Sequence, residues 1–363
     1  MRLCRTETIG PISFFAMLRR FGSARAALEM LPQLARRSER AKTVTAVTRA
    51  AAEAELAALH KAGARLVCWG EPLYPSGLAA IDDAPPLLTV LGLPELLQKP
   101  MVAVVGARNA SANGRRFSRE LAAALGQAGV VVVSGLARGI DAAAHLGALE
   151  TGSVAVVAGG VDVVYPHENR GLHNALARQG AIIAELPLGT EPQARHFPRR
   201  NRIISGMTLG VVVVEAAARS GSLITARLAL EQGRDVFAVP GSPVDPRCRG
   251  SNDLIRHGAT LTENAEDVLS QLGPLLKAGN SAPAAPRAEI PAMPGWPQPE
   301  RGQLIEDEAG FELILERLGP TPVAVDELIR QCHLSAAAVA TLLLELELAG
   351  RVERHPGNLV SLR

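Results

Sequence analysis

Aromatic residues and paired cysteines are scarce in this sequence, and each shortage excludes a class of protein. The chain has 363 residues but only 7 Phe, 2 Trp and 2 Tyr. This is few for RRM or OB-fold modules, because these modules stack successive bases on aromatic faces. The 4 cysteines lie far apart, with no CxxC pair and no His at ligand spacing. We therefore expect neither a zinc site nor a disulfide framework, and no other metal.

Long apolar runs are absent as well. No apolar segment approaches the roughly 18 residues of a membrane-spanning helix, and residues 1–15 are interrupted by Arg and Glu. With 47% apolar and 20% charged residues the chain can still bury large cores, and its length predicts two or three domains. We expect a soluble, cytoplasmic protein without a membrane partner.

Lysine is missing from the middle of the chain. Of 38 basic residues only four are Lys, and none lies between residues 100 and 276. No residue in this stretch can act as a P-loop or Schiff-base lysine, so a bound anion must be held by Arg or by backbone N–H groups. GxGxxG is absent after the first predicted strand, and GxxxxGK[ST] is absent too. These absences argue against NAD and ATP sites, and we expect no cofactor.

Residues 10–60 show the apolar spacing of helices. Apolar residues recur every three or four positions from Phe14 to Leu34. Gly22-Ser23 interrupts the pattern, with Ser23 placed to cap the next helix. Gly-containing hairpins of short helices often dock on DNA backbones, and the alternative is a plain helical bundle. We predict a helical domain over residues 1–64.

From residue 101 onward, short apolar runs alternate with helical stretches. The runs are apolar throughout, which is typical of strands covered on both faces by helices. Repeated units of this kind predict an α/β fold over residues 65–272: an extended Rossmann-like, doubly wound, mainly parallel sheet. The predicted strands are residues 101–106, 130–134, 153–159, 181–186, 209–215 and 235–241.

The remaining residues divide into a linker and a small C-terminal unit. Residues 273–303 are rich in Pro, Ala and Gly without periodicity, which predicts a linker. Residues 304–363 show three helical patterns and a two-stranded ending, the order of a winged-helix domain. Its recognition helix, residues 335–349, contains Glu345 and Glu347 and no basic residue. Such a helix fits poorly in a groove lined by phosphates, so we predict a protein-contact or regulatory module.

The loops that follow the predicted strands carry glycines, small hydroxyl residues and arginines. In a doubly wound sheet ligands bind at the carboxyl ends of the strands, where helix N-termini direct N–H groups at anions. Glycines let a phosphate or sugar approach closely, and arginines neutralise it. The loops that predict this surface are residues 106–109, 134–141, 159–160 and 218–225.

A run of arginines follows the fourth predicted strand. Four of them, at positions 195, 199, 200 and 202, fall within eight residues at the start of a predicted short helix. A helix N-terminus disfavours cations, so the cluster indicates that an anion binds there, and Phe197 adds an apolar face for a sugar or base. The alternative is that the arginines pair with carboxylates such as Glu185, Glu191 and Glu215.

These segments together resemble one family. The sequence contains GARNAS, SGLARGIDAAAH, AVVAGGVDVVYPHEN, HFPRRNRIISG, EAAARSGSLITARLALEQGRDVFAVPG and SNDLIRHGA. In this order they are similar to the DprA/Smf family across the whole Rossmann-like domain, and the helical, SAM-like N-terminal domain and the winged-helix domain also fit. The resemblance implies a recombination mediator that takes single-stranded DNA coated by its binding protein and loads RecA on it, in natural transformation or in recombination and repair.

The resemblance also assigns roles to residues. It implies that Gly106 and Arg108, together with Arg200, Asn201 and Arg202, hold the backbone of single-stranded DNA. With the strand-end loops and the arginine run, the predicted DNA-binding residues are Gly106, Ala107, Arg108, Ser134, Gly135, Arg138, Gly139, Gly159, Gly160, Phe197, Arg199, Arg200, Asn201, Arg202, Ser220, Gly221, Ser222 and Thr225.

The family resemblance further implies a homodimer formed through the last elements of the Rossmann-like domain. Apolar residues of segment 253–272 are expected at the end of the sheet, where few neighbours cover them; the alternative is that they close the domain's own core. Two departures from the family occur. Position 107 is Ala where relatives often have Ser or Thr, and the chain begins within the expected first helix, which leaves open whether the domain starts upstream of Met1. The predicted interface residues are Leu254, Ile255 and Leu269.

Two other functions stay open. A related Rossmann architecture hydrolyses N-glycosidic bonds of nucleoside monophosphates with a Gly-rich loop and a catalytic Glu, and Glu215 ahead of Ser220-Gly221-Ser222 imitates that arrangement. The other is a duplex-binding transcription factor, for which the acidic recognition helix is unfavourable. We favour a binding protein without catalytic residues over an enzyme.

Overall fold

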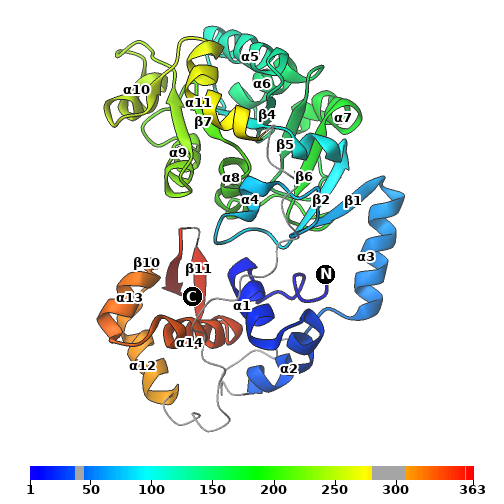
Figure 1. The fold of residues 1–363 in the computed structure, drawn as a ribbon, viewed down its shortest axis with the longest axis vertical. Helices are drawn as coiled ribbons and strands as arrows, with labels where there is room; N and C mark the ends of the chain where they lie inside the picture. Colours follow the sequence, from blue (N-terminus) through cyan, green and yellow to red (C-terminus); the bar gives the residue numbers. More distant parts are fainter. Residues whose placement is uncertain (37–44, 280–306, 356) are drawn as a thin grey trace. The chain divides into compact units, whose positions relative to one another are not determined.

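A computed structural model describes residues 1–36, 45–279, 307–355 and 357–363 (Figure 1). They form two compact units. Unit 1 comprises the described residues within 1–54 and 288–363, and unit 2 comprises the described residues within 55–287. The two terminal regions therefore share one unit, and the central region forms the other.

Unit 2 is built around a nine-stranded sheet with the order β1-β2-β6-β5-β4-β3-β7-β8-β9. All neighbours from β6 to β9 are parallel, while β2 runs antiparallel to β6 and β1 runs antiparallel to β2. The six predicted strands are confirmed as β3 to β8, and they are buried along almost their whole length. The strands are Ala64–Cys68 (β1), Leu87–Gly92 (β2), Met101–Val105 (β3), Val131–Ser134 (β4), Ser153–Val156 (β5), Ala181–Ala184 (β6), Gly210–Val213 (β7), Asp235–Ala238 (β8) and Thr260–Leu261 (β9).

Helices cover this sheet in two layers. The strand order reverses at β3, which lies between β4 and β7, so right-handed crossovers place the helices before and after the reversal on opposite faces. One layer shares an apolar core with the sheet, in which Val104, Leu125 and Phe237 are fully buried. The helices are Ser76–Ala79 (α4), Ala112–Gln127 (α5), Ile140–Ala148 (α6), Arg170–Gln179 (α7), His196–Gly206 (α8), Gly221–Glu231 (α9), Arg249–Arg256 (α10) and Ala265–Gly279 (α11), with 3-10 turns at Pro94–Gln98 (η1), His167–Asn169 (η2) and Pro246–Cys248 (η3).

Unit 1 combines the N-terminal helices with the winged-helix module. Gly22 adopts a φ of 74°, and Ser23 Oγ accepts a hydrogen bond from the Ala26 N–H at 3.1 Å, so the predicted break and cap are confirmed. Ser335 caps the recognition helix through the Ala338 N–H. The elements are Pro11–Phe21 (α1), Ala24–Arg36 (α2), Arg49–Lys61 (α3, which leads into unit 2), Asp307–Arg317 (α12), Val323–Ala324 (β10), Val325–Cys332 (α13), Ala336–Leu348 (α14), Val352–His355 (β11) and Leu359–Leu362 (β12).

The segment predicted as a linker, residues 273–303, begins inside a helix. Leu272 is fully buried in the core of unit 2 and Leu276 packs against that core, so α11 continues to Gly279. The rest of the predicted linker lies outside the described residues. Among the helices that the structure describes, none is long and apolar enough to cross a membrane.

Candidate functional site

A pocket opens at the carboxyl ends of β3, β4 and β5. This edge of the sheet lies beside the reversal of strand order, where open α/β sheets bind their ligands. The pocket has a volume of about 340 Å³. It is lined by Arg108, Gly135, Ala137, Arg138, Val157, Ala158, Gly159, Val163, Tyr165, Pro166, His167, Glu168, Pro192, Phe197 and Arg200. Six of the predicted site residues thus come together: Arg108, Gly135, Arg138, Gly159, Phe197 and Arg200.

Arg200 forms the charged floor of the pocket. Its side chain is buried, and its Nη1 donates to the Val156 carbonyl at 2.9 Å. Burial lowers the pKa of Arg200 to about 10, while Asp141 opposes this shift, so the guanidinium is charged at neutral pH. Asp141 in turn accepts hydrogen bonds from the N–H groups of Gly135 (3.1 Å) and Ala137 (3.3 Å). Salt screens a buried cation much less than an exposed one, so the floor stays positive at physiological ionic strength.

Aromatic rings and a second guanidinium frame the mouth of the pocket. Arg108 Cζ lies 5.1 Å from the centroid of the Phe197 ring. The centroids of Phe197 and Tyr165 are 5.7 Å apart. Tyr165 is 46% exposed, and Arg108 is exposed as well. The mouth therefore offers accessible ring faces beside positive charge, a combination that binds unstacked bases and phosphates.

Two glycines let the strand-end loops close around this pocket. A Cβ at Gly135 would lie 1.7 Å from Arg200 Nη1, so only glycine leaves room for the buried guanidinium. Gly139 has a φ of +79°, and a Cβ there would lie 2.2 Å from the Ala107 carbonyl oxygen. The Ile140 N–H donates to that same oxygen at 3.3 Å. The loops after β3 and β4 are thereby held against each other.

Arg202 differs from the expectation. Its side chain is 4% exposed, with Nη2 2.7 Å from the Glu185 carboxylate and Nε 3.4 Å from Asp83 Oδ2. Burial alone would lower the pKa of Arg202, but Glu185 and Asp83 raise it. Successive helix residues are about 100° apart, so Arg200 and Arg202 project from opposite sides of α8. Because carboxylates occupy its guanidinium, we leave Arg202 out of the proposed DNA contacts.

The other predicted DNA-binding residues do not line the pocket. Ser134 is fully buried and donates to the Val104 carbonyl at 2.6 Å, which joins β4 to β3. Asn201 Nδ2 donates to the Gly221 carbonyl at 3.4 Å, and Ser220 caps α9. The predicted residues outside the pocket lining are Gly106, Ala107, Ser134, Gly139, Gly160, Arg199, Asn201, Arg202, Ser220, Gly221, Ser222 and Thr225.

Glu215 caps a helix and does not line the pocket. Its carboxylate accepts hydrogen bonds from the Ser111 N–H at 2.9 Å and from Ser111 Oγ at 2.5 Å, at the N-terminus of α5. A helix N-terminus favours such a negative charge. A Cβ at Gly114 would lie 2.6 Å from this carboxyl group, so the helix packs directly against it. The carboxylate on which the N-glycosidase alternative depends is thus engaged at a helix N-terminus.

Val163 and residues 165–168 line the pocket but were not predicted as site residues. Asn169 Nδ2 donates to the carbonyls of Leu136 (2.9 Å) and Ala137 (3.2 Å), which holds this segment to the loop after β4. Arg138 and Glu168 form an exposed ion pair at 3.5 Å. The only signal in the sequence was the VYPHEN stretch, which served for the family resemblance alone.

The predicted dimer residues lie near the β9 edge of unit 2. Leu254 and Ile255 are half-buried on α10. Leu269, by contrast, packs against the apolar core of its own domain, which matches the alternative stated from the sequence. The edge strand β9 also exposes Leu261, at 46%. Within the described ranges, no three His, Cys, Asp or Glu side chains gather as a metal site.

Comparison with known proteins gives a consistent result along the chain. Residues 65–273 match the family model of DNA recombination-mediator protein A. Residues 298–358 match the DprA winged helix domain, and residues 1–58 match the DprA-like N-terminal HHH domain. Protein Smf of Escherichia coli (strain K12) is 39% identical over 318 residues, which span 86% of this chain and 81% of that protein.

Solved structures agree with the sequence comparison. The X-ray structure of DNA processing protein A (DprA) from Streptococcus pneumoniae has a TM-score of 0.56 and 42% identity, over 59% of this chain and 77% of that one. A structure that describes the single-stranded DNA binding mode of DNA processing protein A from Helicobacter pylori has a TM-score of 0.53 and 27% identity, over 58% of this chain and 96% of that one. The chain described here belongs to the DprA/Smf family of DNA processing proteins.

Proposed function

We propose that this protein binds single-stranded DNA in the pocket of unit 2 and acts as a recombination mediator. The observation that carries the proposal is the buried Arg200 cation below a mouth formed by Arg108, Phe197 and Tyr165. The guanidinium groups attract the phosphodiester backbone, and the rings stack with bases. Phosphate and stacking contacts do not read base identity, so binding is independent of sequence.

The ring faces favour a single strand over a duplex. Bases in a duplex are stacked on one another and paired, so their faces are not available to Phe197 and Tyr165. A single strand can turn a base toward these rings while its phosphates meet Arg108. The single-stranded DNA binding mode described for the Helicobacter pylori relative supports this choice of ligand.

Fluorescence anisotropy tests this proposal directly. Labelled oligo(dT) and a labelled duplex of equal length are each titrated with the full chain at two salt concentrations. We expect the single strand to bind more tightly, with an affinity that falls as salt rises. Equal affinity for both ligands would remove the pocket as the explanation of binding.

We further propose that the bound strand passes to RecA, in natural transformation or in recombination and repair. The family description as a recombination mediator supports this step. It requires displacement of single-strand-binding protein, and a homodimer assists because two pockets on one assembly hold a strand with avidity. The half-buried Ile255 and the exposed Leu261 at the β9 edge are the surface that we propose for this dimer.

RecA ATP hydrolysis on single strands coated by their binding protein measures the transfer. We expect the wild-type chain to shorten the lag of this reaction. A Leu261→Glu variant should sediment as a monomer, bind oligo(dT) more weakly and lose the effect on RecA. A Leu261→Glu variant that stays dimeric would exclude this edge as the interface.

We propose that the activity is binding rather than catalysis. The carboxylate that could have served an N-glycosidase, Glu215, is engaged at the N-terminus of α5. Incubation with nucleoside monophosphates, followed by chromatography of free bases, should show no release above the background without protein. Base release that a Glu215→Gln variant loses would instead indicate an enzyme.

A further inference from the structure

Helix α14, the recognition helix of the winged-helix module, is apolar on two faces. Leu342, Leu343 and Leu346 pack in the core of the module itself. Leu344 and Leu348, one turn apart on α14, belong to a second buried cluster, where they are 3% and 2% exposed. A helix that is apolar on more than one face requires a further packing partner.

That partner is the N-terminal helical domain within the same unit. The cluster that contains Leu344 and Leu348 is completed by Met17 of α1 and by Ala27 and Leu31 of α2, all of which are almost fully buried. Figure 1 shows α14 beside α1 and α2, in agreement with these contacts. The first and last helical segments of the chain therefore share a core.

The two carboxylates of α14 have partners at this contact. Glu347 accepts a hydrogen bond from Ser13 Oγ and lies 3.3 Å from Arg354 Nε of strand β11. Glu345 lies 3.4 Å from Arg20 Nη1, and its side chain is 8% exposed. Ser13 is in the first turn of α1, which has no acidic residue of its own there. Glu347 thus supplies the negative charge that the N-terminus of α1 favours.

We propose that the recognition face of α14 is a protein-docking surface whose partner is the N-terminal helical domain. Leu344 and Leu348 supply the buried area, and the two carboxylates fix the orientation through Ser13 and Arg20. The charge distribution agrees with this pairing. Residues 1–70 hold 12 basic against 5 acidic residues, and residues 304–363 hold 5 basic against 10 acidic.

The proposal has a consequence for DNA binding by the module. A winged-helix recognition helix reads duplex DNA by entering the major groove, and α14 is covered on the corresponding side. Without its cover, α14 would present leucines, which make no contact with phosphates, and carboxylates, which a phosphate-lined groove repels. The module is therefore a structural partner of the N-terminal helices and not a duplex reader.

Hydrogen–deuterium exchange on the full chain tests the docking. Arg20→Glu places two carboxylates against each other and leaves the sequence of α14 unchanged. We expect amide exchange in α14 and in α1 to become about tenfold faster or more, because a charged contact is lost and the helices undock more often. Arg19→Glu is the matched control, since Arg19 is exposed on the same helix and the change in charge is identical. If Arg20→Glu and Arg19→Glu show equal exchange in α14, the docking proposal is overturned.

A charge swap separates docking from a general loss of structure. Arg20→Glu combined with Glu345→Arg should restore protection in α1 and α14 to the wild-type level. If the double variant changed amide exchange by the sum of the changes in the two single variants, the proposed contact would be overturned. A labelled duplex is the second probe: Arg20→Glu should bind it no better than Arg19→Glu does. A clear gain in duplex affinity in Arg20→Glu would mean that the covered face is a DNA reader, and would overturn the assignment.

Discussion

Arg108 and Arg200 would act on a bound strand in different ways because water reaches only one of them. Arg108 is exposed at the mouth, so its contact with a phosphate would release a counterion and depend on salt. Arg200 is buried on the floor and supplies a positive field that salt screens weakly. The exposed arginine is therefore the one that salt titrations can detect.

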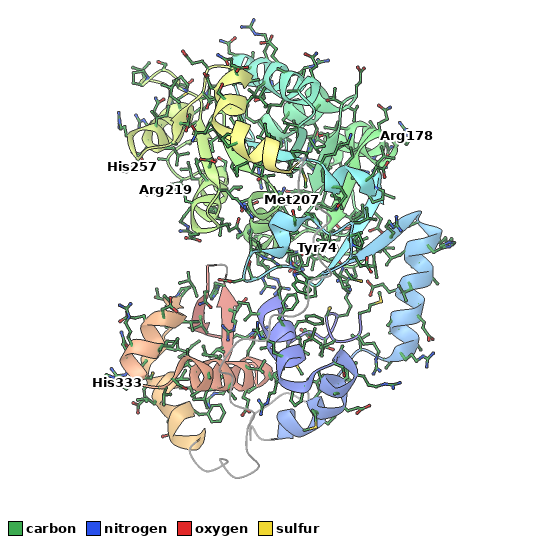
Figure 2. All side chains as sticks on the ribbon, viewed as in Figure 1. Tyr74, Arg178, Met207, Arg219, His257 and His333 are labelled. Atoms are coloured by element: carbon green, nitrogen blue, oxygen red, sulfur yellow. The ribbon has the colours of Figure 1, made fainter. Side chains whose placement is uncertain are left out.

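Replacement of Arg108 should change both the affinity for single strands and its salt dependence. In Arg108→Ala, the slope of log K against log salt for oligo(dT) should flatten by about 0.7, the value for one phosphate contact on a single strand. Phe197→Ala should weaken binding by about 1–3 kcal/mol with the slope unchanged, because stacking involves no counterion. Arg178→Ala is the control, since Arg178 lies on the outside of unit 2 at the end of α7 (Figure 2). An unchanged slope in Arg108→Ala would exclude it as a phosphate contact.

Arg202 should matter for stability and not for the salt slope. Its guanidinium holds β6 and the loop before β2 to α8 through Glu185 and Asp83. Removal of one member of a buried ion pair costs about 3–5 kcal/mol, and Glu185, which is partly exposed, should place Arg202→Ala near the lower end. Urea denaturation measures the loss. If Arg202→Ala were as stable as the wild type but its oligo(dT) affinity depended less on salt, Arg202 would be a DNA contact, as the sequence predicted.

At the level of elements, helix geometry explains why the arginine run divides. The sequence places Arg199, Arg200 and Arg202 in one motif, but residues two apart on a helix project to opposite sides. Periodicity alone could have separated Arg200 from Arg202. It could not have identified Asp83 as a partner, because that residue lies far away in the chain on an irregular segment.

The same reasoning explains which elements the sequence could predict. Strands β3 to β8 are apolar throughout because both faces are covered, and such runs are easily recognised. Strand β1 mixes buried and exposed positions, and β9 has only two residues, so neither gives a clear pattern. The pocket segment 163–168 contains only the short 3-10 turn η2, and its position depends on hydrogen bonds from Asn169 that no spacing rule predicts.

His145 links α6 to β5 and should make the stability of unit 2 sensitive to pH. Its Nδ1 lies 2.7 Å from Ser153 Oγ, and burial, with a contribution from the Arg200 charge, lowers its pKa to about 3. In the unfolded chain His145 binds a proton near pH 6.5, while in the folded chain it stays neutral. The contribution of His145 to stability is therefore fully present above pH 6.5 and is lost as the pH falls toward 3. Between pH 7 and pH 5 the protonation of His145 in the unfolded chain should lower the free energy of unfolding by about 2 kcal/mol. In His145→Asn, the loss of unfolding free energy over this range should be smaller by that amount, and an equal loss in both proteins would contradict the buried, neutral histidine.

At the scale of the whole molecule, the pocket and the chain ends belong to different units. Every residue that lines the pocket belongs to unit 2. The N-terminal helices and the winged-helix module share a core in unit 1. The domain boundary that the sequence suggests, at residue 272, falls inside α11. A chain that ended there would cut α11 and would leave α1 and α2 without α14.

A fragment of residues 49–279 should therefore still bind oligo(dT). In a fragment of residues 1–279, by contrast, α1 and α2 should lose their stable packing. The shorter fragment keeps all nine strands, α11 and the complete pocket. We expect it to unfold cooperatively and to bind oligo(dT) with the salt slope of the full chain. The longer fragment exposes Met17 and Leu31, which lose Leu344 and Leu348. Each of these buried leucines contributes about 1.5–3 kcal/mol, so α1 and α2 should lose their stable packing and bind a hydrophobic dye. If residues 49–279 fold but do not bind oligo(dT), the DNA surface lies outside unit 2, and the assignment of Arg108 and Arg200 to it is wrong.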